Sequence, residues 1–204
     1  MGPAAPRGDH PPHARRRLRQ RLSADPLAGW SLRIIGPHRS EQGGDGEAYL
    51  ASLQALAAAH ALACEFVAPI FDEQALAAEY RRASVFVYPS LAEAGESLGL
   101  APLEAMAAGS AAIVSSLNCF ADYIEDGVTG LQFDHRGADP AADLAAKLEF
   151  LIAAPNRLQK IAEGGRRAAA GFRVAAIAGR MLDDFRSLLA GESPHRQGSR
   201  GARL

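Results

Sequence analysis

Residues 96–109, Glu-Ser-Leu-Gly-Leu-Ala-Pro-Leu-Glu-Ala-Met-Ala-Ala-Gly, carry two glutamates, Glu96 and Glu104, with seven small or apolar residues between them. Glu104 has the only charged side chain between Ser97 and Ala121. Because burying an unpaired carboxylate is costly, such a residue either reaches solvent at an edge or has a dedicated hydrogen-bonding partner. The residues alone also allow a plainer interpretation, in which the stretch is a buried helix with one glutamate extending to solvent.

The same stretch contains the signals that begin and end a helix. Pro102 is acceptable in a first helical turn, and Gly109 is suited to a helix end. We therefore predict a loop followed by a helix that begins near residues 98–100. The first turn would present free N–H groups beside Glu96, an arrangement that binds phosphate and polar ligands. Glu104, one to two turns further along, would then be able to contact the same ligand.

Composition is that of an ordinary globular protein. The 204 residues are 48% hydrophobic and 22% charged, which suits one domain with tails. The formal net charge of -1 argues against a general nucleic-acid binder. No apolar run reaches the roughly 18 residues of a membrane span, and we expect no transmembrane segment or signal peptide. Cys64 and Cys119 lie in apolar contexts without metal-ligand spacing, so we expect buried thiols and a cytoplasmic protein.

Both ends of the chain differ from its middle. Residues 1–29 combine prolines with an arginine run and too few apolar residues for a core, so we predict a disordered tail. A basic arm for an anionic surface is the alternative. Residues 191–204 are rich in Gly, Ser and Arg, and we predict a second disordered tail. The folded domain is expected over residues 30–190.

Within that domain, short apolar strands alternate with helical segments. Strands are predicted at 31–35, 64–67, 84–88, 111–115 and 130–133, and helices at 47–62, 72–82, 98–109, 120–125, 140–153, 155–170 and 174–189. The alternation predicts an α/β fold, a Rossmann-like open parallel sheet with helices on both faces, in which the strand through Val85–Tyr88 is buried on both sides. Such sheets bind ligands beyond the carboxyl ends of their strands, where residues 96–104 follow.

Four motifs together resemble glycosyltransferase family 4. They are Tyr88-Pro89-Ser90, residues 96–109, Ile113-Val114-Ser115 and Glu125-Asp126-Gly127-Val128-Thr129-Gly130-Leu131. The family consists of retaining, sugar-nucleotide-dependent enzymes of the GT-B fold. The resemblance covers about residues 32–189, all within the C-terminal, donor-binding domain of that fold. It implies transfer of a sugar from a nucleotide-diphosphate sugar to an acceptor that the sequence does not identify.

The resemblance also implies roles for the two glutamates and the residues between them. Glu96 would be the catalytic residue and would hydrogen-bond hydroxyls of the donor sugar. Glu104 would accept hydrogen bonds from the nucleotide ribose. The family generally uses no metal in this domain, and no cofactor is implied. The backbone N–H groups that face the sugar and the diphosphate would be those of Ser97, Leu98, Gly99 and Leu100.

The chain departs from the family pattern at three places. The Arg/Lys loop that follows the family's first strand is missing, and so is that strand, which leaves the strands at Leu32 and Val85 either to pair directly or to flank an open seam. Asn118-Cys119 and Asp122 stand where the family usually has Gly-Gly and Glu. No acceptor-binding N-terminal domain is recognised. We therefore predict that the chain is marginally stable or self-associates.

Three functions follow as alternatives. The chain is the donor-binding domain of a hexosyltransferase, or a non-catalytic sugar-nucleotide-binding module or truncated fragment that a separate N-terminal-domain chain completes, or a purely structural, degenerate domain. Retention of Glu96 and Glu104 argues against the last. His60 and His135 are candidate acids or bases, although histidines at a surface or a helix end are far commoner.

Overall fold

A computed structural model describes residues 29–192, and most of the two predicted tails lies outside the described residues. The strands are Leu32–Ile35 (β1), Cys64–Val67 (β2), Val85–Tyr88 (β3), Ala111–Ser115 (β4) and Leu131–Phe133 (β5). The helices are Glu47–Ala59 (α2), Glu73–Arg82 (α3), Leu100–Ala108 (α4), Pro140–Ile152 (α5), Pro155–Ala170 (α6) and Val174–Leu189 (α7), with short 3-10 turns at Ser40–Gln42 (η1) and Asn118–Phe120 (η2). Every strand pair is parallel, which confirms the predicted α/β class.

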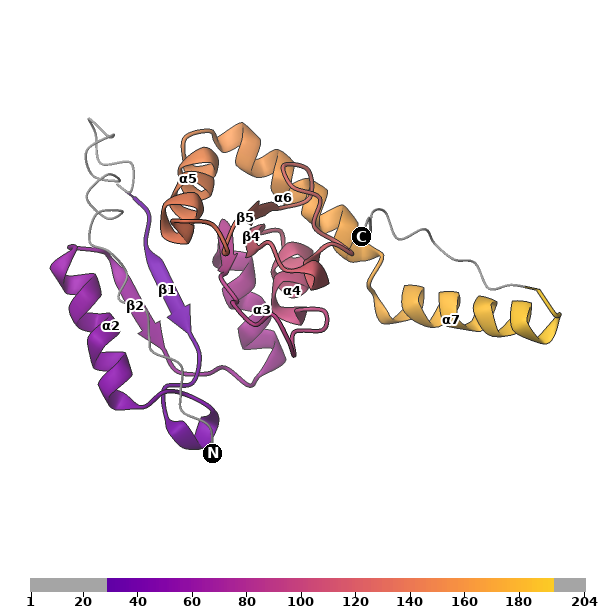
Figure 1. Cartoon of the computed structure of the whole chain (residues 1–204), viewed down its shortest axis with the longest axis horizontal. Coiled ribbons are helices and arrows are strands. Elements are labelled where there is room, and N and C mark those ends of the chain that lie inside the picture. Colours follow the sequence, from indigo (N-terminus) through magenta and orange to yellow (C-terminus); the bar gives the residue numbers. More distant parts are fainter. Residues whose placement is uncertain (1–28, 193–204) are drawn as a thin grey trace.

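The sheet is divided into two parts. β1 pairs with β2, and β3, β4 and β5 form a second sheet in that order, so β1 and β3 are not hydrogen-bonded to each other (Figure 1). Of the two arrangements expected at this position, the open seam is the one found. The amides of Leu32 and Gly36 donate to β2 or its flanking residue. Backbone groups alternate sides along a strand, so those of Arg33 and Ile35 lie on the other edge of β1, which pairs with no strand among residues 29–192 and is called its free edge below.

β3 has the matching free edge. The amide of Ala111 donates to the carbonyl of Ser84, which places the backbone groups of Val85 and Val87 on the side away from β4. All four residues of β3 are only partly buried, so the prediction that this strand is buried on both sides was wrong. An edge position explains the difference, and β4 is the strand that is buried throughout.

β4 separates two hydrophobic cores. Ala112 and Val114 face one core, together with Leu103 and Met106 of α4 and the fully buried ring of Phe120. The opposite face packs against α5 and α6, through residues that include Ala111, Ile113, Leu131, Phe133, Leu151 and Ile161. These two cores fix the position of the β3–α4 connection, which carries the predicted site.

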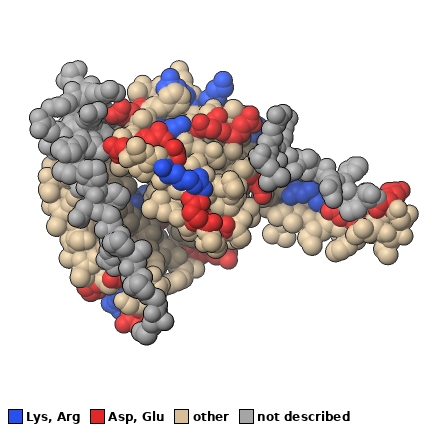
Figure 2. All heavy atoms as spheres, viewed as in Figure 1, with Lys and Arg blue, Asp and Glu red and all other residues tan. Residues whose placement is uncertain are grey.

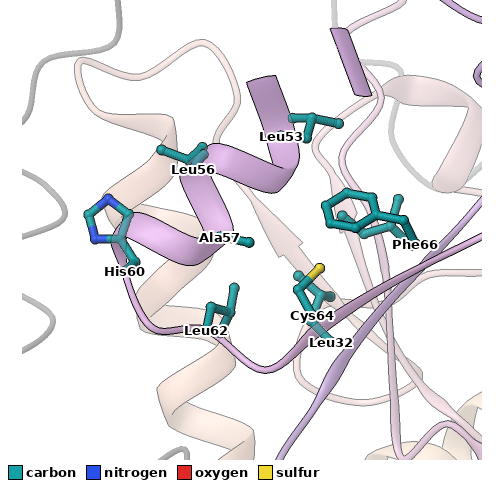
Figure 3. Close-up of a pocket in the computed structure, with 9 residues that line it drawn as sticks. Leu32, Leu53, Leu56, Ala57, His60, Leu62, Cys64 and Phe66 are labelled. Carbon is teal, nitrogen blue, oxygen red and sulfur yellow. The ribbon is translucent and has the colours of Figure 1, made fainter. Parts of the chain in front are cut away.

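The β1–β2 sheet is packed less tightly. α2 contains no buried residue, and an apolar hollow of about 250 Å³ lies between it and the two strands (Figure 3). Leu32 and Ile34 of β1 line this hollow opposite Leu53 and Leu56 of α2. It lies on a different sheet from the β3–α4 connection, so we do not assign the predicted site to it.

The predicted helix at 120–125 is replaced by η2 and a single turn. The amide of Ile124 still donates to the carbonyl of Phe120 at 2.8 Å, as in a helix. The next amide, that of Glu125, instead donates to Oγ1 of Thr129 at 2.7 Å. The Thr129 hydroxyl in turn donates to the carbonyl of Tyr123 at 2.8 Å, so this side chain ends the helical turn.

The last helix, α7, has the predicted bounds and extends away from the rest of the described chain (Figure 1). Its apolar side chains include Met181, Phe185 and Leu189, which are all exposed. None of the helices in residues 29–192 is long and apolar enough to cross a bilayer.

Candidate functional site

α4 begins and ends where the sequence predicts. Gly99 precedes its first residue with φ 68°, and Gly109 follows its last residue with φ 102°. Pro102 lies in the first turn, where its missing N–H is not needed. Glycine is required at 99 for a second reason, because a Cβ there would lie 2.5 Å from Cε1 of Phe120. The loop therefore crosses closely over the buried ring before the helix begins.

Glu96 lies in this loop beside the carboxyl end of β3. The hydroxyl of Tyr88, the last residue of β3, donates to Oε2 of Glu96 at 3.0 Å. Burial of the tyrosine and its bond to Glu96 raise the pKa of Tyr88. Glu96 itself is partly buried. The strand therefore orients the carboxylate directly.

Glu104 combines both arrangements that the sequence left open. Its side chain is exposed to solvent, and its Oε2 accepts a hydrogen bond from the hydroxyl of Tyr80 on α3 at 3.1 Å. Burial, and then the nearby charge of Glu104, raise the pKa of Tyr80 to about 12. The interpretation of a glutamate that merely extends to solvent therefore does not describe the contact that is present.

The loop between the two glutamates is held in place through its own backbone carbonyl groups. The hydroxyl of Tyr123 lies 2.9 Å from the carbonyl oxygens of both Leu98 and Gly99 and donates to them. The amides of Ser97, Leu98 and Gly99 find no acceptor within residues 29–192. Ser97 and Leu100 are exposed. The loop thus presents free amides next to the first turn of α4, whose own first amides have no intrahelical acceptor.

Sequence reasoning missed the aromatic residues that support both glutamates. Tyr80 packs edge-on to Phe86 with centroids 5.6 Å apart, Phe86 stacks on Tyr88 at 6.4 Å, and Tyr88 meets Phe120 at 6.0 Å. The period-2 alternation of Phe86 and Tyr88 along β3 was the available signal, because it places both rings on one face of the strand. This row of rings connects the partner of Glu104 to the partner of Glu96.

A second cluster of polar residues lies at the carboxyl ends of β4 and β5. Nε2 of His135 lies 2.8 Å from Oε1 of Glu93, and its Nδ1 lies 3.1 Å from Oγ of Ser116. Arg136 donates to Oε2 of Glu93 at 2.6 Å and to the carbonyl of Ser116 at 3.0 Å. The side chain of His135 is only 3% exposed, so the expectation of a surface histidine was wrong for this residue. His60 does lie at a helix end, after α2.

The loop that departs from the family pattern lies close to Glu96. Asn118 and Cys119 are part of η2. Burial, and then the charge of Glu96, raise the pKa of the Cys119 thiol. A reactive thiolate is therefore disfavoured at this position.

No lysine or arginine within residues 29–192 forms an ion pair with either glutamate of the site. Two arginines are paired with other carboxylates: Arg136 with Glu93, and Arg33 of β1 with Glu79 of α3 and with Glu65. Acidic and basic side chains are mixed over the described part of the face drawn in Figure 2, without a continuous basic area. The same residues contain no group of three His, Cys, Asp or Glu side chains placed to hold a metal ion.

Solved structures with this architecture are glycosyltransferases. The sucrose-phosphate synthase of Thermosynechococcus elongatus superposes with a TM-score of 0.63 at 27% identity, over 82% of this chain and 41% of that protein. The HepE protein of Anabaena, solved in complex with UDP and glucose, has a TM-score of 0.62 at 19% identity, over 80% of this chain and 43% of that one. At that identity the likeness to HepE concerns the fold alone.

Sequence relatives lead to the same group of proteins. A D-inositol 3-phosphate glycosyltransferase of Frankia alni is 34% identical over 122 residues, which is 60% of this chain and 28% of that protein. An alpha-maltose-1-phosphate synthase of Mycobacterium tuberculosis is 36% identical over 113 residues, 53% of this chain and 28% of that protein. The match thus spans less than a third of the length of these relatives. The model for "Glycosyl transferases group 1" matches residues 17–168, three quarters of the chain, and the chain belongs to this family.

Proposed function

We propose that this chain binds a nucleotide-diphosphate sugar and forms the donor-binding part of a retaining hexosyltransferase. One observation carries the proposal. Glu96 and Glu104 flank the N-terminal turn of α4, and in each the tyrosine hydroxyl occupies only Oε2. Oε1 of both carboxylates accepts no hydrogen bond from the described residues, so each is available to a ligand hydroxyl.

In this proposal the two carboxylates hold different parts of the donor. Glu96 accepts hydrogen bonds from hydroxyls of the transferred sugar and is the catalytic residue. Glu104 accepts them from the ribose. The diphosphate lies against the free amides of residues 97–100, where the partial positive charge of the helix N-terminus favours an anion. The match to the group 1 glycosyltransferase family supports a sugar donor.

The proposed transfer requires positive charge near the diphosphate, which the described residues do not supply. A departing nucleoside diphosphate is stabilised mainly by cations on its phosphates. Arg33 and Arg136 are each paired with a carboxylate already. We therefore propose that turnover requires cations from a second chain or domain that also binds the acceptor. The alternative function, a sugar-nucleotide-binding module without turnover, rests on the same observation.

Calorimetry on the full chain tests the binding step. Wild type is titrated with UDP-glucose, UDP-N-acetylglucosamine and GDP-mannose, and with UDP and GDP. Glu104→Gln should weaken a sugar nucleotide and its nucleoside diphosphate equally, by about tenfold for one charged hydrogen bond. Glu96→Gln should weaken the sugar nucleotide only. Absence of binding at millimolar ligand would overturn the proposal.

A turnover assay separates the enzyme from the binding module. Release of nucleoside diphosphate from the bound donor is followed with the chain alone, and then with candidate N-terminal-domain chains added. Binding without release under either condition favours the module.

We also propose a cytoplasmic site of action, with which the free cysteines Cys64 and Cys119 agree.

A further inference from the structure

The loop that delivers Glu96 is ordered by an unusual set of contacts. Residues 91–95 are all exposed, so apolar burial does not fix them. Local bonds are present within the loop, from the amide of Glu93 to the carbonyl of Leu91 and from the amide of Ala92 to Oγ of Ser90. Among residues 29–192, the contacts that connect this segment to the sheet are those of the Glu93 side chain, with His135 and Arg136.

Each partner of Glu93 is itself firmly placed. His135 has a side chain only 3% exposed, and its second ring nitrogen lies 3.1 Å from Oγ of Ser116. Arg136 uses its other Nη atom to donate to the carbonyl of Ser116 at 3.0 Å. Both oxygens of Glu93 are therefore engaged by groups that are anchored at the ends of β4 and β5. Solvent screens the exposed pair of Glu93 with Arg136, so the enclosed ring of His135 is the firmer of the two anchors.

Glu93 and Glu96 are separated only by Ala94 and Gly95. Three residues of extended chain span at most about 10 Å, so fixing Glu93 restricts where Glu96 can be. Gly95, with φ 96° and nothing within 4 Å of a built Cβ, is the point about which the segment would pivot. The hydroxyl of Tyr88 then holds the carboxylate of Glu96 from the other side.

The order hydroxyl, imidazole, carboxylate in Ser116, His135 and Glu93 is also that of an activated nucleophile. Two contacts argue against that chemistry. Arg136 donates to Oε2 of Glu93 at 2.6 Å and offsets the negative charge that would otherwise stabilise an imidazolium. The imidazole is almost fully enclosed, so it cannot pass a proton to a substrate. The geometry is that of an anchor for the loop.

We propose that Glu93, His135 and Arg136 form a clamp that positions Glu96 against the donor sugar. These three are positioning residues, since none of them touches the ligand in this arrangement. The inference rests on the proposed function, because it assigns the clamp to the sugar end of the same donor site. It predicts that loss of the clamp impairs recognition of the sugar and leaves recognition of the nucleoside diphosphate unchanged.

The test uses the full chain, four single variants, and Glu93→Ala in a Glu96→Gln background. Glu93→Ala removes both bonds of the clamp, Arg136→Ala removes one of them, and Glu93→Asp retains the charge on a shorter arm. Leu91→Ala is the matched control, because Leu91 lies on the same exposed loop and its side chain is 65% exposed. Amide hydrogen exchange is measured without ligand at Ala92 and Glu93, whose amides are hydrogen-bonded within the loop. Calorimetry is then run with the sugar nucleotide that wild type binds best among UDP-glucose, UDP-N-acetylglucosamine and GDP-mannose, and with its nucleoside diphosphate.

The clamp predicts faster exchange at residues 92 and 93 and about tenfold weaker binding of the sugar nucleotide in Glu93→Ala and Arg136→Ala. Nucleoside diphosphate affinity should be unchanged, and Leu91→Ala should behave as wild type. Glu93→Asp should restore part of the loss. In a Glu96→Gln background, Glu93→Ala should add nothing. Equal weakening of both ligands would indicate a purely structural role and overturn the inference, as would unchanged binding. Failure of wild type to bind any ligand would overturn the proposed function and the positioning role together.

Discussion

The hydroxyl of Tyr80 donates to Oε2 of Glu104 across the boundary between α3 and α4, over 3.1 Å. α3 lies between β2 and β3 in the chain and packs against α4, so the bond connects two neighbouring helices. The phenol is partly buried, and the carboxylate is exposed. The carboxylate of Glu104 is therefore held by α3 through one oxygen and is otherwise exposed to solvent.

This bond predicts a shift that a tyrosine titration can measure. The pKa of Tyr80 is raised to about 12, by burial and then by Glu104, so Glu104→Gln should lower it toward the ordinary value of about 10. Because the folded pKa is the higher one, the stabilisation that this proton provides is complete below about pH 10 and is lost as pH rises through about 12. Tyrosinate absorbance, compared with Tyr80→Phe, identifies the transition. An unchanged high-pH transition in Glu104→Gln would remove Glu104 as a cause.

A pair of glycines in α6 predicts a change in stability. A Cβ on Gly164 would lie 2.1 Å from the carbonyl oxygen of Val128, and one on Gly165 would lie 2.7 Å from that of Thr129. Gly164→Ala should therefore destabilise the chain by about 1–3 kcal/mol, measured by urea unfolding. Gly179 in α7 has nothing within 4 Å of a built Cβ.

Gly179 thus provides the matched control for Gly164. Glycine in an open helical position costs roughly 0.5–1 kcal/mol relative to alanine, so Gly179→Ala should increase helicity and stabilise α7. The two substitutions are chemically identical and are expected to act in opposite directions. Stabilisation by Gly164→Ala would contradict the close approach of α6 to the 126–130 turn.

The open seam predicts self-association through the free edge of β1. Unpaired strand edges are templates for pairing with another chain. Ile35→Pro removes an amide that points away from β2, and should reduce association without breaking the β1–β2 ladder, whereas Ile34→Pro should break it. Sedimentation at several concentrations measures the association. A monodisperse wild-type monomer with a cooperative, high melting transition would count against this prediction.

The ion pair at Glu93 predicts an acid-sensitive loop. Arg136, and then His135, hold the pKa of Glu93 below its usual range, so its contribution is present at neutral pH, above the unfolded pKa, and is lost as pH falls through the lower folded value. Hydrogen exchange at Ala92 and Glu93, whose amides are hydrogen-bonded, should accelerate, after correction for the intrinsic rate, when pH falls into that range. Glu93→Gln should show no such dependence. A wild-type loop whose protection is independent of acid would contradict it.

The strand and helix positions were predictable because their signals are local. The β-branched runs, the Asp72 cap and the prolines that open α5 and α6 each fix a boundary without help from the rest of the chain. The prediction failed at residues 120–125, where a side chain competes with the helical bond. Thr129 ends the turn after η2 by binding the amide of Glu125, and the apolar pattern of residues 120–125 does not show this contact.

The two glutamates of the site could be predicted from the sequence, but the residues that hydrogen-bond to them could not. Their spacing around Pro102 is a feature of one continuous stretch. Their partners, Tyr80 and Tyr88, come from other elements, and the pairing depends on how α3 lies against α4. The partners of Glu93 lie more than forty positions further along the chain, at the end of β5. Such contacts become visible only when the sheet order is known.

The division of the sheet has a consequence for the order in which the parts of the molecule unfold. The cores on the two faces of β4 belong to β3–β5 with α4, α5 and α6, whereas β1, β2 and α2 share only a loose apolar hollow. These parts correspond to separate cooperative units of unequal free energy. The less stable unit, which contains β1, β2 and α2, is expected to open first. Glu96 and Glu104 then remain in the folded unit. We therefore expect the proposed recognition of a donor to persist when β1, β2 and α2 have opened.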